Sequence, residues 1–168
     1  MQNRSQAREG LSIQTVEETM KDLSPFPADR FDCIIHPVSN CFVDDVRPVW
    51  SEAFRVLGRG GTLLSGFNNP DVYLFDPETM GSTGKLEVGN RLPRSDMDRW
   101  DEGQKRAKAE QGVPMEFSHT LELLIGGQMD AGFMLAVLYE DNDLQGENVL
   151  INECMRPYVA ARALKAAR

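Results

Sequence analysis

The segment FDCIIHPVSNCFVDDVRPVWSEAFRVLGRGGTLLSGF, residues 31–67, predicts how the whole chain is organised. It begins with a short apolar run, Phe31–His36, and ends with a second one, Thr62–Phe67. Between them lie a polar loop, a stretch with helical periodicity and a glycine-rich turn. Two buried-type strands on either side of one helix are typical of a βαβ unit with parallel strands. Such a crossover is nearly always right-handed, so the helix should cover one face of the sheet.

The helix within this segment has apolar residues at a 3.6-residue period. These are Val46, Val49, Trp50, Ala53, Phe54 and Leu57. The pattern predicts a buried face that includes Trp50. Asp44–Asp45 can cap the start of the helix, and Gly58 can end it in a left-handed conformation. Glu52 and Arg55 are one turn apart, and we expect them to pair on the solvent side.

The flanking sequence predicts the remaining elements. We expect strands at 11–17, 133–139 and 158–164, and helices at 95–111 and 120–130. The strand at 133–139 has the composition of a buried strand. The helix at 120–130 should turn four residues towards the core: Leu121, Leu124, Ile125 and Met129. The last two strands have no clear helix between them, which favours an antiparallel pair at the end of the sheet.

Composition limits the classes of protein that this chain can represent. Its 168 residues suffice for one domain, with 41% apolar and 26% charged residues. The net charge of −8 argues against nonspecific binding to nucleic acid or anionic membranes. No apolar run approaches the roughly 20 residues of a membrane span, and the N-terminus lacks a secretory signal. Cys33, Cys41 and Cys154 have no metal-type spacing, so we expect reduced thiols in the cytoplasm.

Several of these residues together resemble a known family. An FD-plus-apolar strand is followed by E-x-x-RVL-x-x-GG, with Glu52, Arg55–Leu57 and Gly60–Gly61 as the matching positions. The similarity extends upstream to Met20–Phe26. In order and spacing the chain is similar to the second half of class I S-adenosylmethionine-dependent methyltransferases of the methyltransferase type 11 kind. One departure is Arg59, where the family usually has proline.

The resemblance implies an α/β, Rossmann-like sheet that ends in an antiparallel strand pair. It also implies a single partial domain over residues 1–168, truncated at the N-terminus just before the family's third strand, without the glycine-rich cofactor loop. Residues 71–115 would be an insertion that forms a lid. Without the missing strands, the edge of the strand at Phe31 would be open. An open edge invites association, so the chain is a possible homo-oligomer.

The resemblance also implies S-adenosylmethionine as the cofactor and assigns residues to it. The family's acidic contact to the adenine falls on Thr19, and a backbone N–H contact falls on Met20. His36, Pro37 and Val38, at the end of a parallel strand, would touch the methionine part of the cofactor, because ligands of open α/β sheets bind at that end. For Thr19 an ordinary surface loop is an equal alternative.

The predicted catalytic and acceptor residues lie near the same strand ends. His36 could act as a base on the acceptor, since the pKa of histidine is near neutral. The alternative is that His36 only bonds to the nearby backbone. Asn40, Phe42 and Asn68 would contact a small-molecule acceptor, although Phe42 could instead belong to the core and Asn68 to a simple turn. The sequence predicts no nucleic-acid partner and no membrane partner.

A metal site is not predicted. His119 lies three residues after Glu116, but two side chains without a third ligand make a poor zinc site. A role at a helix start or in the lid is the preferred interpretation of His119.

Three functions remain open at this point. The first is methyl transfer from S-adenosylmethionine to an unidentified, small-molecule acceptor. The second is a noncatalytic truncated remnant that serves as a binding partner or has no activity. The third is a nicotinamide-dependent dehydrogenase, which has a similar sheet, but E-x-x-RVL-x-x-GG is not typical of that class. A glycine-rich loop would also be needed there, and we find none in the sequence.

Overall fold

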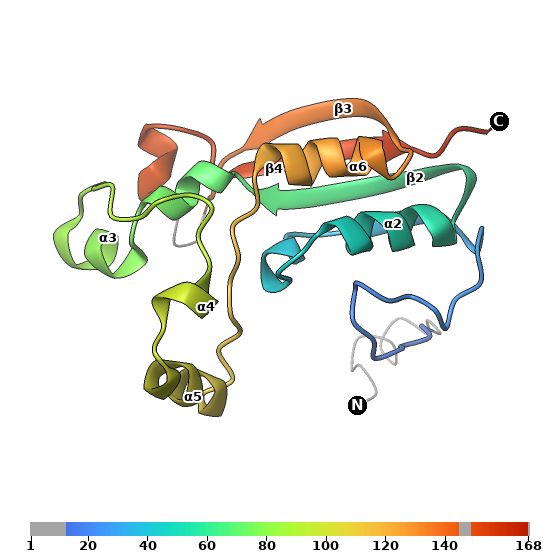
Figure 1. Ribbon diagram of the computed structural model, residues 1–168. Coiled ribbons are helices and arrows are strands. Elements are labelled where there is room, and N and C mark those ends of the chain that lie inside the picture. The colour runs from blue at the N-terminus through green and yellow to red at the C-terminus, as the bar shows by residue number, and fades with distance from the viewer. Residues whose placement is uncertain (1–12, 145–148, 168) are drawn as a thin grey trace.

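The computed structural model describes residues 13–144 and 149–167, which form one four-stranded sheet with helices and an extended arm (Figure 1). The strands are β1 (Phe31–His36), β2 (Leu57–Asn68), β3 (Met134–Asp141) and β4 (Tyr158–Leu164). The α-helices are α2 (Arg47–Val56), α3 (Pro77–Thr83), α4 (Asp96–Arg99), α5 (Glu102–Glu110) and α6 (Gly127–Asp130). Short 3-10 helices are η1 (Asn40–Phe42), η2 (Pro70–Leu74) and η4 (Val149–Glu153), and η3 (Glu122–Gly126) is a π-helix.

The sheet has the strand order β1-β2-β4-β3. β1 and β2 are parallel, whereas β4 is antiparallel to both β2 and β3. The predicted βαβ unit and the antiparallel final pair are therefore both confirmed. Within the described residues β1 pairs only with β2, so its other edge has no strand neighbour. The strand expected at 11–17 is absent over residues 13–17, and residues 11 and 12 lie outside the described part.

The connection from α2 to β2 differs from the prediction. β2 begins at Leu57 directly after the helix, five residues earlier than expected. Gly58 does not take the left-handed conformation; Gly60 does, with a φ of 78°. Phe31 is opposite Leu57 but Cys33 is opposite Thr62, so β2 bulges between these two pairs. The glycines supply the backbone freedom for that bulge rather than a helix cap.

The core lies between the sheet and two helical segments. α2 and α6 run along the same face of the sheet (Figure 1), and their residues contact each other. Trp50 of α2 is fully buried there, and its indole N–H donates to the carbonyl of Leu123 at 3.0 Å. Leu63 and Phe67 of β2 are also fully buried on this face. Each such side chain contributes on the order of 1.5–3 kcal/mol to stability by leaving water.

The opposite face of the sheet stays exposed to solvent. Ile35 is 72% exposed, and it lies in a row across the sheet with Leu64, Arg162 and Val137. Further exposed apolar side chains of β3 on this face are Met134 and Tyr139, whereas Leu138, also exposed, lies opposite Ala161 on the other face. The expectation of a buried strand at 133–139 was therefore wrong. β3 is an edge strand, and its apolar composition alone could not distinguish an edge from a centre.

The helix expected at 120–130 forms, but the residues that it buries differ from the prediction. Leu124 is buried and Ile125 is half-buried, whereas Leu121 and Met129 are about half exposed. The buried residues are Leu124, Gly127 and Gln128, which are three and four residues apart, so the buried face is centred on small and polar residues that a search for apolar side chains does not find.

Glu52 and Arg55 pair as predicted, but they also fix the preceding loop. The Arg55 Nε donates to Glu52 Oε1 at 2.7 Å. The Arg55 guanidinium also donates to the carbonyls of Phe26 and Leu23, and the Leu23 N–H donates to Glu52 Oε2 at 2.7 Å. The pair is partly buried rather than on the solvent side, because the 23–26 loop covers it.

Residues 71–115 form an arm that extends away from the sheet and contains α3, α4 and α5 (Figure 1). The single helix expected at 95–111 is divided at Trp100 and Asp101. Ser95 caps α4, and Asp101 with Gln104 forms a reciprocal capping box on α5. In the described residues we find no helix that is both long and apolar enough to span a membrane.

Candidate functional site

His36 lies at the C-terminal end of β1, on the covered face of the sheet. Its ring meets the Trp50 indole edge-on, with 5.4 Å between the ring centroids. Burial lowers the pKa of His36, so its imidazole is neutral at neutral pH. Its Nε2 is enclosed and has no hydrogen-bond partner. The backbone bond offered as the alternative role of His36 is therefore not made through Nε2.

The other predicted cofactor residues lie in two places. Pro37 and Val38 are exposed at the end of β1, where Val38 lies close to Gly66 of β2. Thr19 is exposed, and its hydroxyl oxygen accepts only a long bond from the Lys21 N–H at 3.4 Å. Met20 packs against the main core. None of these four residues lines a cavity described below.

The predicted acceptor residues have three different environments. Asn40 is buried, its carbonyl lies 3.0 Å from His119 Nε2, and its side-chain Nδ2 has no partner. Phe42 is 43% exposed, so the core role considered for it was wrong. Asn68 ends β2 and borders a cavity.

His119 is buried against Asn40, and the described residues contain no group of three metal-binding side chains.

A cavity of about 240 Å³ lies at the C-terminal end of β2, and we call it the polar cavity. Its polar lining residues are Asn68, Tyr73, Arg94, Glu116 and Tyr158, and its apolar ones are Val72, Phe75, Pro77 and Met80. They come from β2, η2, α3, β4 and two stretches of the arm. Arm residues, Arg94 among them, thus lie at the end of β2.

Hydrogen bonds hold the polar side chains of this cavity in place. The Asn68 amide donates to the Tyr73 hydroxyl at 2.9 Å, and the Tyr158 hydroxyl donates to Asp143 at 3.2 Å. Arg94 donates to the carboxylate of Asp96 at 2.7 Å. Such bonds reduce the freedom of the side chains and leave a preformed hollow.

The two acidic hydrogen donors in this region are held neutral. Burial raises the pKa of the Cys41 thiol to about 11, and the charge of Glu116 adds to that effect. Burial also raises the pKa of the Tyr73 phenol, again with a contribution from Glu116. Cys41 is therefore a thiol at neutral pH, which makes it a poor nucleophile.

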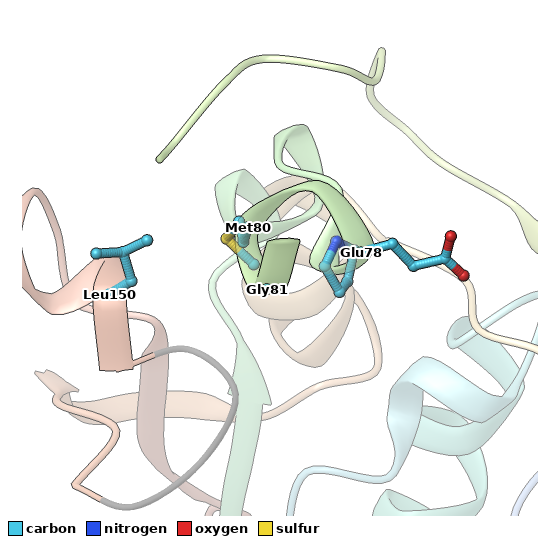
Figure 2. Close-up of a pocket in the computed structure, with 5 residues that line it drawn as sticks. Glu78, Met80, Gly81 and Leu150 are labelled. Carbon is cyan, nitrogen blue, oxygen red and sulfur yellow. The ribbon is translucent and has the colours of Figure 1, made fainter. Parts of the chain in front are cut away.

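A second cavity of about 370 Å³ adjoins the first, and we call it the apolar cavity. Its lining is Pro77, Glu78, Met80, Gly81 and Leu150. Figure 2 shows Met80 and Leu150 on facing segments, with the Glu78 carboxylate directed away from the space between them. Pro77 and Met80 line both cavities, so the two hollows meet at the start of α3.

The sequence of this chain is similar to those of known methyltransferases. Residues 1–65 match the model of a family described as "Methyltransferase domain". The chain is 42% identical over 158 residues to an uncharacterized methyltransferase, YbaJ, from Bacillus subtilis (strain 168). That similarity covers 94% of this chain and 60% of the relative. The chain is thus similar to class I S-adenosylmethionine-dependent methyltransferases, and it spans 60% of the length of the curated relative.

Solved structures share the fold of this chain. An S-adenosylmethionine-dependent methyltransferase from Mesorhizobium loti aligns with a TM-score of 0.63 at 16% identity, covering 95% of this chain and 74% of that one. The [4+2]-cyclase SpnF aligns with a TM-score of 0.60 at 15% identity, covering 98% and 61%. At such identities the likeness shows the Rossmann-like fold alone, and the cyclase illustrates that one fold supports different reactions.

The resemblance to methyltransferases implies S-adenosylmethionine as the cofactor, and the described residues provide only part of a site for it. Pro37 and Val38 form an exposed wall at the end of β1. His36 faces Trp50, and Met20 is packed in the core, so their side chains are already occupied. Among the described residues no glycine turn joins a strand to a following helix, which is the geometry for close approach to such a ligand.

Most residues of the polar cavity were not found from the sequence. Only Asn68 had been assigned to an acceptor, whereas Tyr73, Arg94 and Tyr158 drew no attention, and Glu116 was weighed only as a metal ligand. These residues lie in four separate stretches without a common spacing. Only the folding of the arm over β2 brings them together.

Proposed function

We propose that this chain serves methyl transfer from S-adenosylmethionine to a small-molecule acceptor. The observation that supports the proposal most strongly is the 42% identity to a protein named as a methyltransferase. This chain spans 60% of that relative, so the activity of the whole relative is itself only proposed for this chain. S-adenosylmethionine supplies an activated methyl group on a sulfonium. Catalysis of this type depends largely on proximity and alignment in a dry pocket.

The polar cavity is the proposed acceptor site. Asn68 lies at the C-terminal end of a parallel strand, where open α/β sheets bind their ligands. The cavity is small, which favours a small molecule over a polymer. His36 stays a predicted base, since its neutral imidazole can accept a proton. The three free cysteines agree with the cytoplasm as the proposed compartment.

Calorimetric titration tests the cofactor part of this proposal. Purified chain would be titrated with S-adenosylmethionine and, separately, with its demethylated product. We expect saturable binding of both at micromolar concentrations, weakened by Val38→Lys at the exposed wall. Val88→Lys, at an apolar residue of the arm that is 70% exposed, is the control. Folded chain that binds neither ligand up to millimolar concentrations would refute cofactor binding.

A noncatalytic binding module is the second proposed function. The uncovered apolar face of the sheet favours it, because large exposed apolar patches usually mark interaction surfaces. The absence of a strand-to-helix glycine turn in the described residues favours it too. In this case the polypeptide that covers the face is a second copy of the chain, joined through the face and the open edge of β1. Failure of the cofactor titration together with a stable dimer would support this function.

A further inference from the structure

His119 has a fixed ring orientation where the arm returns to the sheet. The backbone before it is held, because the Ser118 N–H donates to the carbonyl of Arg94 at 2.8 Å. The ring is buried, and its Nε2 lies 3.0 Å from the carbonyl oxygen of Asn40. A carbonyl can only accept, so Nε2 carries the hydrogen of this bond. In the neutral imidazole the other nitrogen, Nδ1, is then an acceptor with a lone pair.

Nδ1 of His119 is available to a ligand. In the described part of the chain the ring makes one hydrogen bond, through Nε2, so Nδ1 has no partner there. Protein atoms do not enclose Nδ1, whereas they do enclose the unpartnered Nε2 of His36. His119 is 6% exposed and lines a cavity, so the accessible part of its ring faces that cavity. Buried side chains usually have their polar atoms paired, so this unpaired acceptor indicates a binding site.

The cavity beside His119 has a volume of about 250 Å³, and we call it the histidine cavity. Pro70 and Asp71 line it just after β2 ends, and Asn40, which orients His119, follows β1. The cavity thus lies at the carboxyl ends of the two parallel strands, where open α/β sheets bind their ligands. None of its described lining residues also lines the polar cavity, so the two sites are separate.

The walls of the histidine cavity are largely apolar. Its apolar lining residues are Pro70, Leu92, Pro93 and Leu121. Asp71 is the charged residue of the described lining, and its negative charge disfavours a carboxylate or a phosphate. The ligand should therefore have an apolar body without a negative charge.

Ser118 and Thr120 complete the polar lining. The Thr120 hydroxyl oxygen accepts the Leu123 N–H at 3.2 Å. The Ser118 hydroxyl oxygen accepts the Arg94 N–H, which leaves its own hydrogen to donate. A ligand hydroxyl can donate to His119 Nδ1 and also accept, so it matches this lining, whereas a carboxylate has no hydrogen for Nδ1.

We propose that the histidine cavity is a second ligand site, which binds a small, uncharged molecule with an apolar body and a hydroxyl group. The hydroxyl donates its hydrogen to Nδ1 of His119, and the apolar body packs against Leu92 and Pro93. Simple phenols belong to this class. The inference goes beyond the proposed function, because the site is separate from the polar cavity and depends neither on cofactor binding nor on methyl transfer.

The test compares two ligands of nearly equal shape on the wild-type chain at about pH 8, where imidazoles are normally neutral. Phenol has the hydroxyl group, and toluene has a methyl group in its place. Hydrophobic transfer alone favours toluene, so a preference for phenol reports the hydrogen bond. We expect ligand-observed NMR to show phenol binding about fivefold more tightly, the scale of one neutral hydrogen bond. Toluene binding as tightly as phenol, or neither binding to folded chain, would overturn the proposal.

The imidazole nitrogens locate the bound phenol. The chain has two histidines, so a two-bond proton–nitrogen NMR spectrum contains two ring systems, which His36→Gln assigns. We expect His119 in the free chain to have a protonated Nε2 and an unprotonated Nδ1, and phenol to shift the Nδ1 signal saturably. A protonated Nδ1 in the free chain, or an Nδ1 signal that phenol leaves unchanged, would refute the assignment to His119.

Two variants separate Nδ1 from the rest of the lining. His119→Gln keeps an amide donor for Asn40 but has no counterpart of Nδ1, so we expect it to lose the preference for phenol over toluene. Thr120→Val removes a hydroxyl that the Leu123 N–H already occupies, and it should keep the preference. Equal losses in both variants would refute the role of His119.

Failure of this proposal can be distinguished from failure of the proposed function. Circular dichroism would first establish that His119→Gln is folded, and if it is not, the nitrogen spectrum of the wild-type chain still decides the matter. Cofactor binding with no preference for phenol would refute the histidine cavity alone. Phenol bound at Nδ1 without cofactor binding would support the histidine cavity and count against methyl transfer.

Discussion

Gly132 is a residue whose backbone and surroundings both require glycine. It joins α6 to β3 with a φ of 108°, and a Cβ added there would lie 2.8 Å from Cζ of Phe54. We expect Gly132→Ala to destabilise the fold by about 2–4 kcal/mol, combining backbone strain with overpacking of the core. Thermal unfolding should show a melting temperature lower by roughly 5–15 °C.

Gly81 provides the matched control for that substitution. It lies inside α3, and no atom is within 4 Å of a Cβ built there. Gly81→Ala should therefore leave stability unchanged or raise it by up to about 1 kcal/mol, because alanine is a better helix former. A similar loss in both variants would contradict the assigned role of Gly132.

At the scale of elements, the Arg55–Glu52 pair attaches the 23–26 loop to α2. Arg55→Met keeps the apolar stem but removes the donors to Leu23 and Phe26. We expect amide exchange at Leu23 to accelerate roughly tenfold, the scale of one charge-assisted bond in a partly exposed site. Arg47→Met on the same helix is the control, because within the described residues Arg47 pairs only with Asp45, and it is 67% exposed. Equal acceleration in both variants would refute the attachment.

The same attachment should depend on pH. Hydrogen bonds from Arg55 hold the pKa of Glu52 below its ordinary value. A carboxyl with a lowered pKa stabilises the folded state above its unfolded pKa, and this contribution disappears as the pH falls through the folded one. Protection of the Leu23 amide should therefore be complete at neutral pH and decrease below the ordinary glutamate range. Glu52→Gln removes the titrating group and should abolish this dependence, and a dependence that persists in that variant would assign it to another group.

At the scale of the whole molecule, the uncovered face of the sheet should drive self-association. Ile35 is 72% exposed on the edge strand β1, beside the exposed Leu64. We expect wild-type chain to form dimers in sedimentation velocity at tens of micromolar, and Ile35→Lys to weaken the dimer at least tenfold by placing a charge on the apolar face.

Val88→Lys is the control for this experiment. Val88 is 70% exposed, nearly the same as Ile35, but it lies in the arm away from the sheet. It should not change the dimer constant. A wild-type chain that stays monomeric at high micromolar concentrations would contradict association through this face.

The sequence predicted most of the sheet because the patterns that indicate strands and helices lie within short stretches of the chain. Phe31–His36 and Tyr158–Leu164 have the predicted bounds, and the helical period around Trp50 correctly placed it in the core. Hydrophobic periodicity reports which side of an element is apolar, and chain order then limits the topology to a few choices. The parallel unit and the antiparallel end pair followed from these signals, and the resemblance to methyltransferases followed from the E-x-x-RVL-x-x-GG pattern.

Only the tertiary structure decided which apolar surfaces are covered and which polar residues meet. The composition of β3 predicted burial, yet Met134 and Tyr139 are exposed, because covering depends on what packs above a strand. The polar cavity joins Asn68 with Arg94 and Glu116, separated by up to 48 residues in the sequence, and with Tyr158 of the last strand. No periodicity connects such positions. Their proximity arises from the path of the arm, which long-range packing fixes.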